Sequence, residues 1–464
     1  MLALMTAFPR AIFSGKELDV VRWFAEKCHI PGMPSQSTIQ SRFELILKML
    51  GLESRLVWSK LGNHFAVNSI KAILANEMAN PLVQKDMVFY PQDDGPSLRQ
   101  AANGKRWTEE IRPALAAPMA RKYLVNGHQD YFVYEPFLAS TTGTSTTPSP
   151  NPYMPFRYFE REGELFARAH LLIPHQHNGK MGFLVDIDSH SEIPLSQFLL
   201  PLPEFCLRHK AYGLPSPESI IGKCSVDTLS QVEAWTEPVE NPWRKRANGK
   251  MLRSLPLWLY CDNTSGNLSK KWNKHNSFLF TIAGLPRDQT QLPYNIHFLA
   301  TSNIASPLEM LEEIASELND ALLDGVMAYD CKVNEDVIIV PWVYAMQGDN
   351  PMQSELCSHI GMTGKFFCRI CKVWGKDKDQ VNDQESEIER VQEFMKEARK
   401  TGVKDKYLTA FLAIMKDKLD AYPSRRSRQD TIEVLKKLRQ NIPDKPFNPA
   451  LLLPGRLLNS PLGL

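Results

Sequence analysis

The sequence has no long apolar run, few cysteines and almost no net charge. No stretch of the 464 residues approaches the roughly 18 apolar residues that a membrane span needs, and residues 1–10 lack the pattern of a secretory signal. We therefore expect a soluble intracellular protein with no membrane partner. Lys and Arg number 54 against 52 Asp and Glu, so a nucleic-acid function would depend on local basic patches. The eight cysteines are too sparse for a disulfide scaffold, and only the last three cluster.

The N-terminal part of the sequence has helical patterns. Ser14 and Glu17 have the spacing of a capping box, and residues 39–50 form an amphipathic run that stops at a glycine. We expect residues 1–139 to be a mostly helical region.

A polar segment follows the helical region. Residues 140–152 read STTGTSTTPSPNP, a low-complexity composition typical of a flexible linker or an exposed loop. We place a domain boundary there. Beyond it, strand patterns at 165–172 and 181–187 predict an α+β region over 153–250.

Two basic stretches are candidates for DNA contact. Arg244, Lys245 and Arg246 lie together in the first, and Lys270, Lys271 and Lys274 flank a tryptophan in the second. Cations beside an aromatic ring are typical of single-strand binding surfaces. A solvated loop is the common alternative for such a run.

Residues 251–355 show the most regular pattern. Ser306, Pro307 and Glu309 form a capping box with proline at the first helical position, and Gly325 marks the helix end. The predicted elements are, in order, strand 255–261, strand 277–283, strand 294–300, helix 306–325 and strand 337–344.

This order matches the opening of a ribonuclease H-like domain. In that fold, acidic residues at the end of the first strand and just after the fourth lie side by side, and here those places hold Asp262 and Asp349. Two carboxylates from neighbouring strands can bind Mg²⁺ or Mn²⁺ for two-metal phosphoryl transfer. The alternative is local: Asp262 precedes Asn-Thr-Ser-Gly, a good turn, and Asp349 is a good helix start.

The clustered cysteines predict a zinc site. Cys368 and Cys371 form a CxxC knuckle, preceded by Cys357 and His359. We favour zinc held by His359, Cys368 and Cys371, with Cys357 as the fourth ligand. A redox CxxC and two buried free cysteines are the alternatives.

Several long motifs resemble one family of transposases. They are CDNTSGNLSKKWNKH at 261–275, YNIHFL at 294–299, GDNPMQSE at 348–355 and GKFFCRIC at 364–371. In this order they are similar to the Plavaka transposases of mushroom-forming fungi, which belong to the Kyakuja, Dileera and Zisupton superfamily. The resemblance extends from about residue 75 to about residue 447, through DYFVY at 130–134 and MPFR at 154–157.

The resemblance implies a DDE transposase that cuts and joins transposon DNA with two divalent ions. It maps Asp262 and Asp349 onto the first two catalytic positions and places a zinc knuckle near the second. The family commonly has two Asp residues before Thr-Ser-Gly-Asn, whereas the second position here is Asn263. If the second member is the family's ligand, the first metal position is damaged. Nuclear residence, binding to transposon ends, and association with itself or with a full-length transposase are also implied.

Three hypotheses follow. The leading one is a truncated transposase-like protein, inactive alone, because the tail carries no acid where a third catalytic carboxylate is expected. The second is a non-catalytic, zinc-containing DNA-binding or protein-interaction remnant. The third is an active nuclease whose third ligand is Glu355 or an Asp of the helical insertion.

The expected fold class is α/β with an incomplete ribonuclease H-like core and an N-terminal α+β region. From the core onward the expected parts are the partial core at 251–355, the zinc knuckle at 356–380, a helical insertion at 381–445 and an irregular tail at 446–464.

Overall fold

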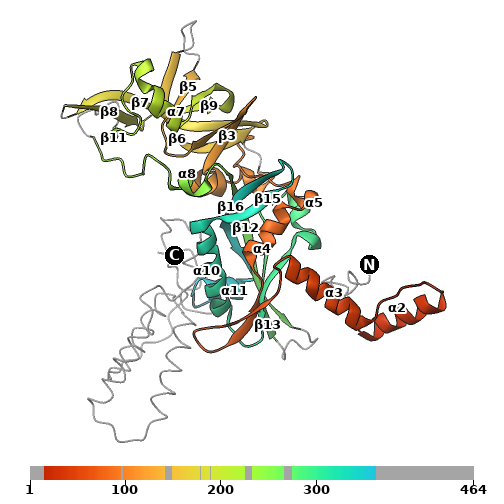
Figure 1. Cartoon of the computed structure of the whole chain (residues 1–464). Helices are drawn as coiled ribbons and strands as arrows, with labels where there is room; N and C mark the ends of the chain where they lie inside the picture. Colours follow the sequence, from red (N-terminus) through yellow and green to blue (C-terminus); the bar gives the residue numbers. More distant parts are fainter. Residues whose placement is uncertain are drawn as a thin grey trace, which may run out of the picture.

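The computed structural model of the chain shows a mixed α/β protein. It describes residues 15–95, 98–141, 149–177, 179–188, 190–224, 232–265 and 274–361. The predicted cysteine pair of the zinc knuckle, the helical insertion at 381–445 and the tail at 446–464 lie outside these residues. The described residues form two large sheets, one above the other in the view of Figure 1, and a two-stranded hairpin lies between the two sheets.

The central sheet has seven strands in the order β1-β2-β14-β13-β12-β16-β15. β12 and β16 are parallel, and the other neighbouring pairs are antiparallel. The strands are β1 Arg55–Trp58, β2 His64–Val67, β12 Met251–Ser265, β13 Lys274–Ile282, β14 His297–Ser302, β15 Val326–Asp330 and β16 Glu335–Gln347.

The predicted order of three strands, a helix and a strand is present in this sheet. Helix α10, Pro307–Asp324, follows β14 and has the predicted capping box: Ser306 Oγ accepts a hydrogen bond from the Glu309 amide, and Glu309 accepts one from the Ser306 amide at 2.7 Å. Gly325 is its C-cap. The structure adds β15 between α10 and β16, a five-residue strand too short to give a clear pattern.

Helices and connecting segments cover both faces of the central sheet. On one face, α10 packs with α4 and α11, and its buried leucines and isoleucine belong to the same core as the β12 residues Leu255, Leu257 and Leu259. On the other face, Trp107 packs edge-on against Trp342 of β16, with ring centroids 5.8 Å apart. The covering elements are α4 Ile70–Met78, α5 Pro81–Gln84, η1 Ala101–Asn103, η2 Arg106–Glu110, α6 Pro113–Ala116, α9 Arg287–Thr290, η6 Pro293–Asn295 and α11 Asn350–Leu356.

The second sheet has the strand order β10-β5-β6-β7-β8-β11, with β9 paired to β7. Its strands are β5 Phe137–Thr141, β6 Ser149–Arg161, β7 Glu164–His177, β8 Lys180–Asp186, β9 Ser191–Pro194, β10 Phe198–Leu200 and β11 Ile220–Cys224. Accompanying elements are the hairpin strands β3 Met119–Leu124 and β4 Gly127–Phe132, and η3 Leu195–Gln197, α7 Leu202–Arg208, η4 His209–Tyr212 and α8 Pro242–Ala247.

The segment 140–152, expected to be a linker between domains, contributes to this second sheet at both of its ends. β5 and β6 pair antiparallel, with Ser140 opposite Pro150 and Leu138 opposite Pro152. The described residues of the segment therefore form the ends of two paired strands of one sheet. Its Ser, Thr and Pro composition hid the strands, because sheet pairing overrides weak local propensity.

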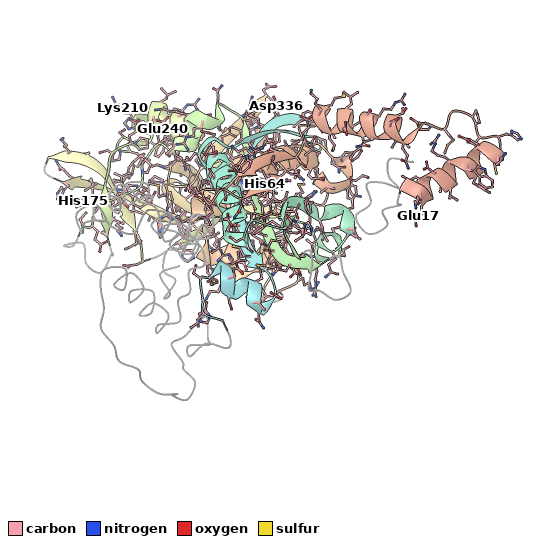
Figure 2. All side chains as sticks on the ribbon, turned by 90° about the horizontal axis from the view of Figure 1, so that it is seen from below. Glu17, His64, His175, Lys210, Glu240 and Asp336 are labelled. Carbon is pink, nitrogen blue, oxygen red and sulfur yellow. The ribbon has the colours of Figure 1, made fainter. Side chains whose placement is uncertain are left out.

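Residues 1–139, expected to be mostly helical, supply strands to both large sheets and the hairpin. Helices α2, Gly15–Lys27, and α3, Gln36–Met49, extend away from the sheets in both views (Figure 1, Figure 2). After them, β1 and β2 extend the central sheet at β14, where Val67 pairs with Ala300. These four-residue strands depend on long-range pairing that local patterns do not reveal. No helix in the described ranges is long and apolar enough to cross a membrane.

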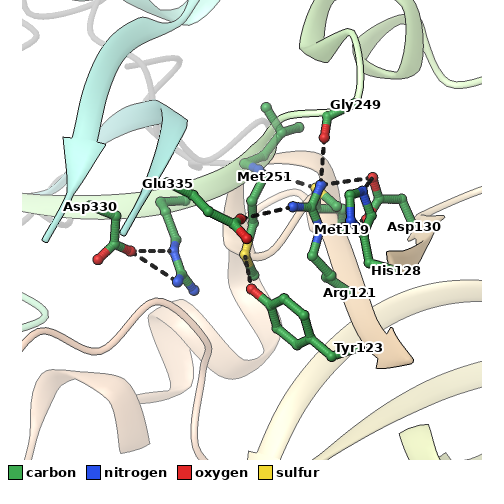
Figure 3. A network of polar contacts seen from close by, with 11 residues as sticks. Met119, Arg121, Tyr123, His128, Asp130, Gly249, Met251, Asp330 and Glu335 are labelled. Carbon is green, nitrogen blue, oxygen red and sulfur yellow. Dashed lines mark hydrogen bonds and ion pairs between the residues drawn. The ribbon is translucent and has the colours of Figure 1, made fainter. Parts of the chain in front are cut away.

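A network of buried charges connects the β3–β4 hairpin to the central sheet (Figure 3). Arg121 of β3 binds both carboxylate oxygens of Asp130 at 2.7 and 2.9 Å, the Gly249 carbonyl at 2.7 Å and Glu335 of β16 at 3.3 Å. The Arg121 side chain is 2% exposed. This network lies where β12 and β16 begin, at the opposite end of those strands from Asp262 and Asp349.

Candidate functional site

The candidate site lies where the parallel strands β12 and β16 end. Their register pairs Tyr260 with Gln347, and each strand reaches its acidic residue two positions later, at Asp262 and Asp349. Because parallel strands run in the same direction, these two residues lie at the same end of the two strands. The structure thus places the two acidic residues that the sequence singled out on neighbouring strands, at the same end of the sheet.

A glycine allows β16 to approach β12 closely at this edge. A Cβ atom on Gly348 would lie 2.9 Å from the carbonyl oxygen of Cys261 and 3.1 Å from Cγ of Met352. Larger residues would push the end of β16 away from β12. Gly348 therefore determines how closely the end of β16, and with it Asp349, can approach Cys261.

Asp262 belongs to a strand and not to a turn. It pairs with Ser277 of β13, and β12 continues to Ser265. Its carboxylate accepts hydrogen bonds from the Tyr260 hydroxyl at 2.8 Å and from the Asn263 amide at 2.7 Å. Asn263 is exposed, at the position where the resembling family commonly has a second Asp.

Asp349 is exposed and begins helix α11. One of its oxygens accepts a hydrogen bond from the Met352 amide at 2.8 Å, which is the N-cap interaction. The local alternative for Asp349, a helix start, is therefore present in the structure. Because the cap uses one oxygen, it leaves the carboxylate's other oxygen without a role in the helix.

The two carboxylates create a negative potential at this edge. The pKa of Tyr260 is raised to about 12, chiefly by its hydrogen bond to Asp262, with further contributions from burial and from the charges of Asp262 and Asp349. Burial raises the pKa of the Cys261 thiol, and the charges of Glu355, Asp262 and Asp349 raise it further. Glu355 of α11 thus brings a third negative charge close to the end of β12.

Side-chain alternation separates these groups onto the two faces of β12. Cys261 is 1% exposed and faces the α10 side with Leu257 and Leu259, whereas Tyr260 and Asp262 face the other side. Within the described ranges, no group of three or more His, Cys, Asp and Glu side chains is arranged to hold a metal ion. The arrangement offers Asp262 and Asp349 as two hard oxygen ligands, which suits Mg²⁺ because this ion retains several waters.

Two of the four expected zinc ligands lie in the described chain. Cys357 is exposed at the C-cap of α11, and His359 follows two residues later. Nδ1 of His359 accepts a hydrogen bond from the Gly361 amide at 3.0 Å, while its buried Nε2 has no hydrogen-bond partner among the described residues. The expected ligands Cys368 and Cys371 lie outside the described residues.

The first basic stretch lies on α8 and is used largely within the fold. Arg244 binds the buried carboxylate of Glu135 at 2.9 and 3.0 Å and the Asp130 carbonyl at 2.9 Å. Its guanidinium group lies 4.6 Å from the centre of the Phe132 ring. These contacts engage the Arg244 guanidinium group within the fold.

The other predicted basic residues differ in exposure. Lys245 is exposed and pairs with Glu240 at 3.0 Å, and Arg246 donates a hydrogen bond to the Leu323 carbonyl at 3.0 Å. Lys274 is the first residue of β13. Lys270 and Lys271 lie outside the described residues.

Buried ionic residues that no sequence pattern predicted also hold this arrangement. Besides Arg121 and Glu135, Arg157 is 6% exposed and donates to the carbonyls of Trp107, Glu109 and Ile111. Asp130 and Arg157 belong to DYFVY at 130–134 and MPFR at 154–157, and their side chains make contacts within the fold.

The fold and the site define a mixed α/β protein whose central sheet ends in a pair of carboxylates. In comparisons with known proteins, residues 119–253 match the model of a domain of unknown function, DUF8591. This segment runs from β3 to the beginning of β12 and contains the second sheet. No curated protein matches the chain.

Proposed function

We propose that this chain is a DDE transposase-like protein whose central sheet is a ribonuclease H-like core. The observation that supports the proposal is the parallel register of β12 and β16, with Tyr260 opposite Gln347 and Asp262 and Asp349 at equivalent positions beyond them. In a ribonuclease H-like domain, three sequential strands are followed by a helix, and the fourth strand lies beside the first. Here β12, β13 and β14 follow one another, α10 comes next, and β16 lies beside β12. Its proposed partner is transposon-end DNA, in the nucleus.

Asp262 and Asp349 are the proposed ligands of Mg²⁺ or Mn²⁺. A bound divalent ion would supply an activated water and charge stabilisation for phosphoryl transfer. The protein's own contribution is to position the two carboxylates: Tyr260 and the Asn263 amide orient Asp262, and the α11 cap orients Asp349.

The test is Mn²⁺ binding by the purified chain, measured by electron paramagnetic resonance. We expect Asp262→Asn and Asp349→Asn each to weaken binding at least tenfold. Asn retains the N-cap at position 349, so the change removes charge and keeps the helix start. Asp336→Asn is the matched control, because Asp336 is exposed at the beginning of the same strand, β16 (Figure 2).

Tyr260 provides a second readout of the same site. Its pKa, about 12 in the free protein, should fall toward its ordinary value when a cation neutralises the carboxylates or when Asp262→Asn removes the charged acceptor. Phenolate absorbance or tyrosine NMR, compared with a Tyr260→Phe variant, would measure this. Equal Mn²⁺ affinity in all the variants would overturn the proposal.

DNA nicking separates the catalytic from the non-catalytic alternative. Mn²⁺-dependent nicking that is lost in both Asp variants would assign an active nuclease. Cation binding without nicking would agree with both inactive hypotheses, the truncated transposase-like protein and the zinc-containing DNA-binding or interaction protein.

We also propose a structural zinc ion held by Cys357, His359, Cys368 and Cys371. The buried Nε2 of His359 supports it. Because Nδ1 accepts from the Gly361 amide, a neutral ring carries its proton on Nε2, so binding through either nitrogen must open that contact. Elemental analysis should find one zinc per chain, lost in His359→Gln and Cys371→Ser and retained in the exposed control Cys28→Ser. Zinc content undiminished by both changes would exclude this site.

A further inference from the structure

A pocket of about 390 Å³ opens on the central sheet near the carboxylate pair. Segments distant in sequence form its lining: Arg99 and Gln100 before η1, Trp258 of β12, Thr281 of β13, Arg287 of α9 and Gln347 of β16. Its volume is within the range of small-molecule sites, about 300–1,000 Å³. No helix terminus or single residue defines it, because four parts of the chain converge there.

The pocket lies on the same face of β12 as Tyr260 and Asp262. Trp258, Tyr260 and Asp262 alternate with the buried Leu259 and Cys261, so their side chains share one face. Gln347 lines the pocket and pairs with Tyr260. From Trp258 to Asp262 is four residues, or about 13 Å along the strand.

The charge of the lining favours an anion. Arg99 and Arg287 are exposed and contribute two guanidinium groups, and none of the residues that line the pocket is acidic. The Arg287 amide donates a hydrogen bond to the side chain of Gln100 at 2.9 Å, which holds α9 against the segment before η1. The two arginines therefore lie on segments tied to each other.

The remaining lining favours a planar, hydrogen-bonding group. Trp258 is half-buried, and its ring lies 4.6 Å from that of Tyr344, which restricts the orientation of the indole. Gln100, Gln291 and Gln347 provide amide donors and acceptors around it. An indole with amides suits a nucleobase, since every base has a face for stacking and a polar edge.

We propose that this pocket binds one nucleotide, with the base against Trp258 and the phosphate at Arg99 and Arg287. Two sources have this chemistry: an unpaired nucleotide of a DNA strand, and a free nucleotide. Trp258 lies about 13 Å along β12 from Asp262, a distance that a DNA strand can span, so the location favours the strand, which in that case extends from the pocket to the carboxylates. Binding in the pocket requires no metal, so it can be tested separately from the proposed function.

The test uses a short fluorescein-labelled oligothymidylate and the whole chain in EDTA. Fluorescence anisotropy gives the affinity, and unlabelled duplex, single strand and thymidine monophosphate serve as competitors. The variants are Arg287→Gln and Trp258→Leu, with Arg208→Gln on α7 of the second sheet as the exposed control. Thermal unfolding verifies that each variant is folded. Photocrosslinking with 5-iodouracil in the strand identifies the residues that contact the base.

We expect Trp258→Leu to weaken binding about 5- to 100-fold, the loss that removal of one stacked base produces. Arg287→Gln should weaken it several-fold, and Arg208→Gln should leave it unchanged. A crosslink at Trp258 or Tyr344 supports the proposal, and effective competition by the monophosphate would identify a free nucleotide as the ligand. The proposal is overturned if the strand and the monophosphate both fail to bind, or if all the variants bind alike.

The result is distinguishable from failure of the metal proposal. Asp262→Asn and Asp349→Asn should retain strand binding in EDTA, while Arg287→Gln should retain Mn²⁺ binding. Loss of strand binding in the Asp variants instead would mean that the strand is held by the carboxylate edge and not by the pocket.

Discussion

Arg244 is a basic side chain whose charge is neutralised within the fold. Its partner Glu135 is 2% exposed, and the Asn241 amide also donates to that carboxylate at 2.9 Å. Burial raises the pKa of Glu135, while Arg244 and the Asn241 amide oppose that rise. The pair joins α8 to the loop between β4 and β5, so we expect its loss to lower the stability of the fold.

Replacing Arg244 tests this structural role. Arg244→Met should lower the free energy of unfolding by about 3–5 kcal/mol, because a buried charge loses its partner. The pKa of Glu135 then rises further, so the carboxyl binds a proton more readily in the folded state and the deficit is smaller at pH 5 than at pH 8. Denaturant unfolding at both pH values measures this.

Lys245→Met is the matched control for Arg244→Met. Lys245 is 79% exposed in its side chain and pairs with a partly exposed Glu240, so its loss should cost less than about 1 kcal/mol. Equal losses in the two variants, or a deficit that grows as the pH falls, would contradict the structural assignment of Arg244.

The role of a residue was predictable where that residue lies next to a segment with a clear strand or helix pattern. Asp262 and Asp349 each follow a predicted strand, and the match of the element order to a ribonuclease H-like domain led us to expect them side by side. Arg121 and Glu135 gave no such signal, because their partners lie 9 and 109 residues away and nothing local requires them to be charged. The Gly348 contact with Cys261 likewise depends on a register that the sequence does not specify.

The elements of the central sheet differ in how far their own residues determine them. α10 has a cap, a proline, an apolar face and a terminal glycine, all within one segment. β1, β2 and β15 have four or five residues each and are completed by neighbours from elsewhere. The polar composition of residues 140–152 gave no strand pattern for the ends of β5 and β6. Whether a segment is a helix or a strand was therefore predictable where its own residues determine the structure. It was not predictable where pairing with a distant strand determines it.

The junction of β16 and α11 is an element-scale test of the site. Gly348→Ala would place a Cβ 2.9 Å from the Cys261 carbonyl, and relief of that contact should cost about 1–3 kcal/mol. The end of β16 must then shift, so Mn²⁺ affinity should fall together with the unfolding temperature. A variant that loses stability and retains full Mn²⁺ affinity would show that Asp349 does not depend on this approach.

Polar contacts link the two large sheets through the β3–β4 hairpin. On one side, Lys122 of β3 donates hydrogen bonds to the Ser196 carbonyl at 2.9 Å and to the Phe198 carbonyl of β10 at 2.5 Å; on the other side, the hairpin contacts the central sheet. Arg121 contacts Asp130, Glu335 and the Gly249 carbonyl, and a second buried pair joins Arg253 to Asp330 at 3.0 Å. The first connects the hairpin to β16, and the second connects β12 to the end of β15. Both lie away from the carboxylate edge, so they stabilise the assembly without occupying the site.

Arg121→Met tests the connection at the scale of the whole molecule. Asp130 would lose both of its bonds to Arg121, and the loss should be about 3–5 kcal/mol. We expect calorimetry to resolve separate unfolding of the two sheets in this variant and a joint transition in the unaltered chain. Arg208→Gln, an exposed change on α7, should retain the joint transition. Two transitions already present in the unaltered chain would refute the coupling.

Helix α11 has a consequence for insertions and deletions. Asp349 caps its first turn, and Cys357 is its C-cap, so the helix fixes a spacing of about 12 Å between these two residues, at 1.5 Å per residue. Adding or removing one residue would also rotate one end by about 100° relative to the other, at 3.6 residues per turn. The length of α11 thus determines both the distance between its two ends and their relative rotation. The helix can therefore tolerate substitutions more readily than any change in the number of its residues.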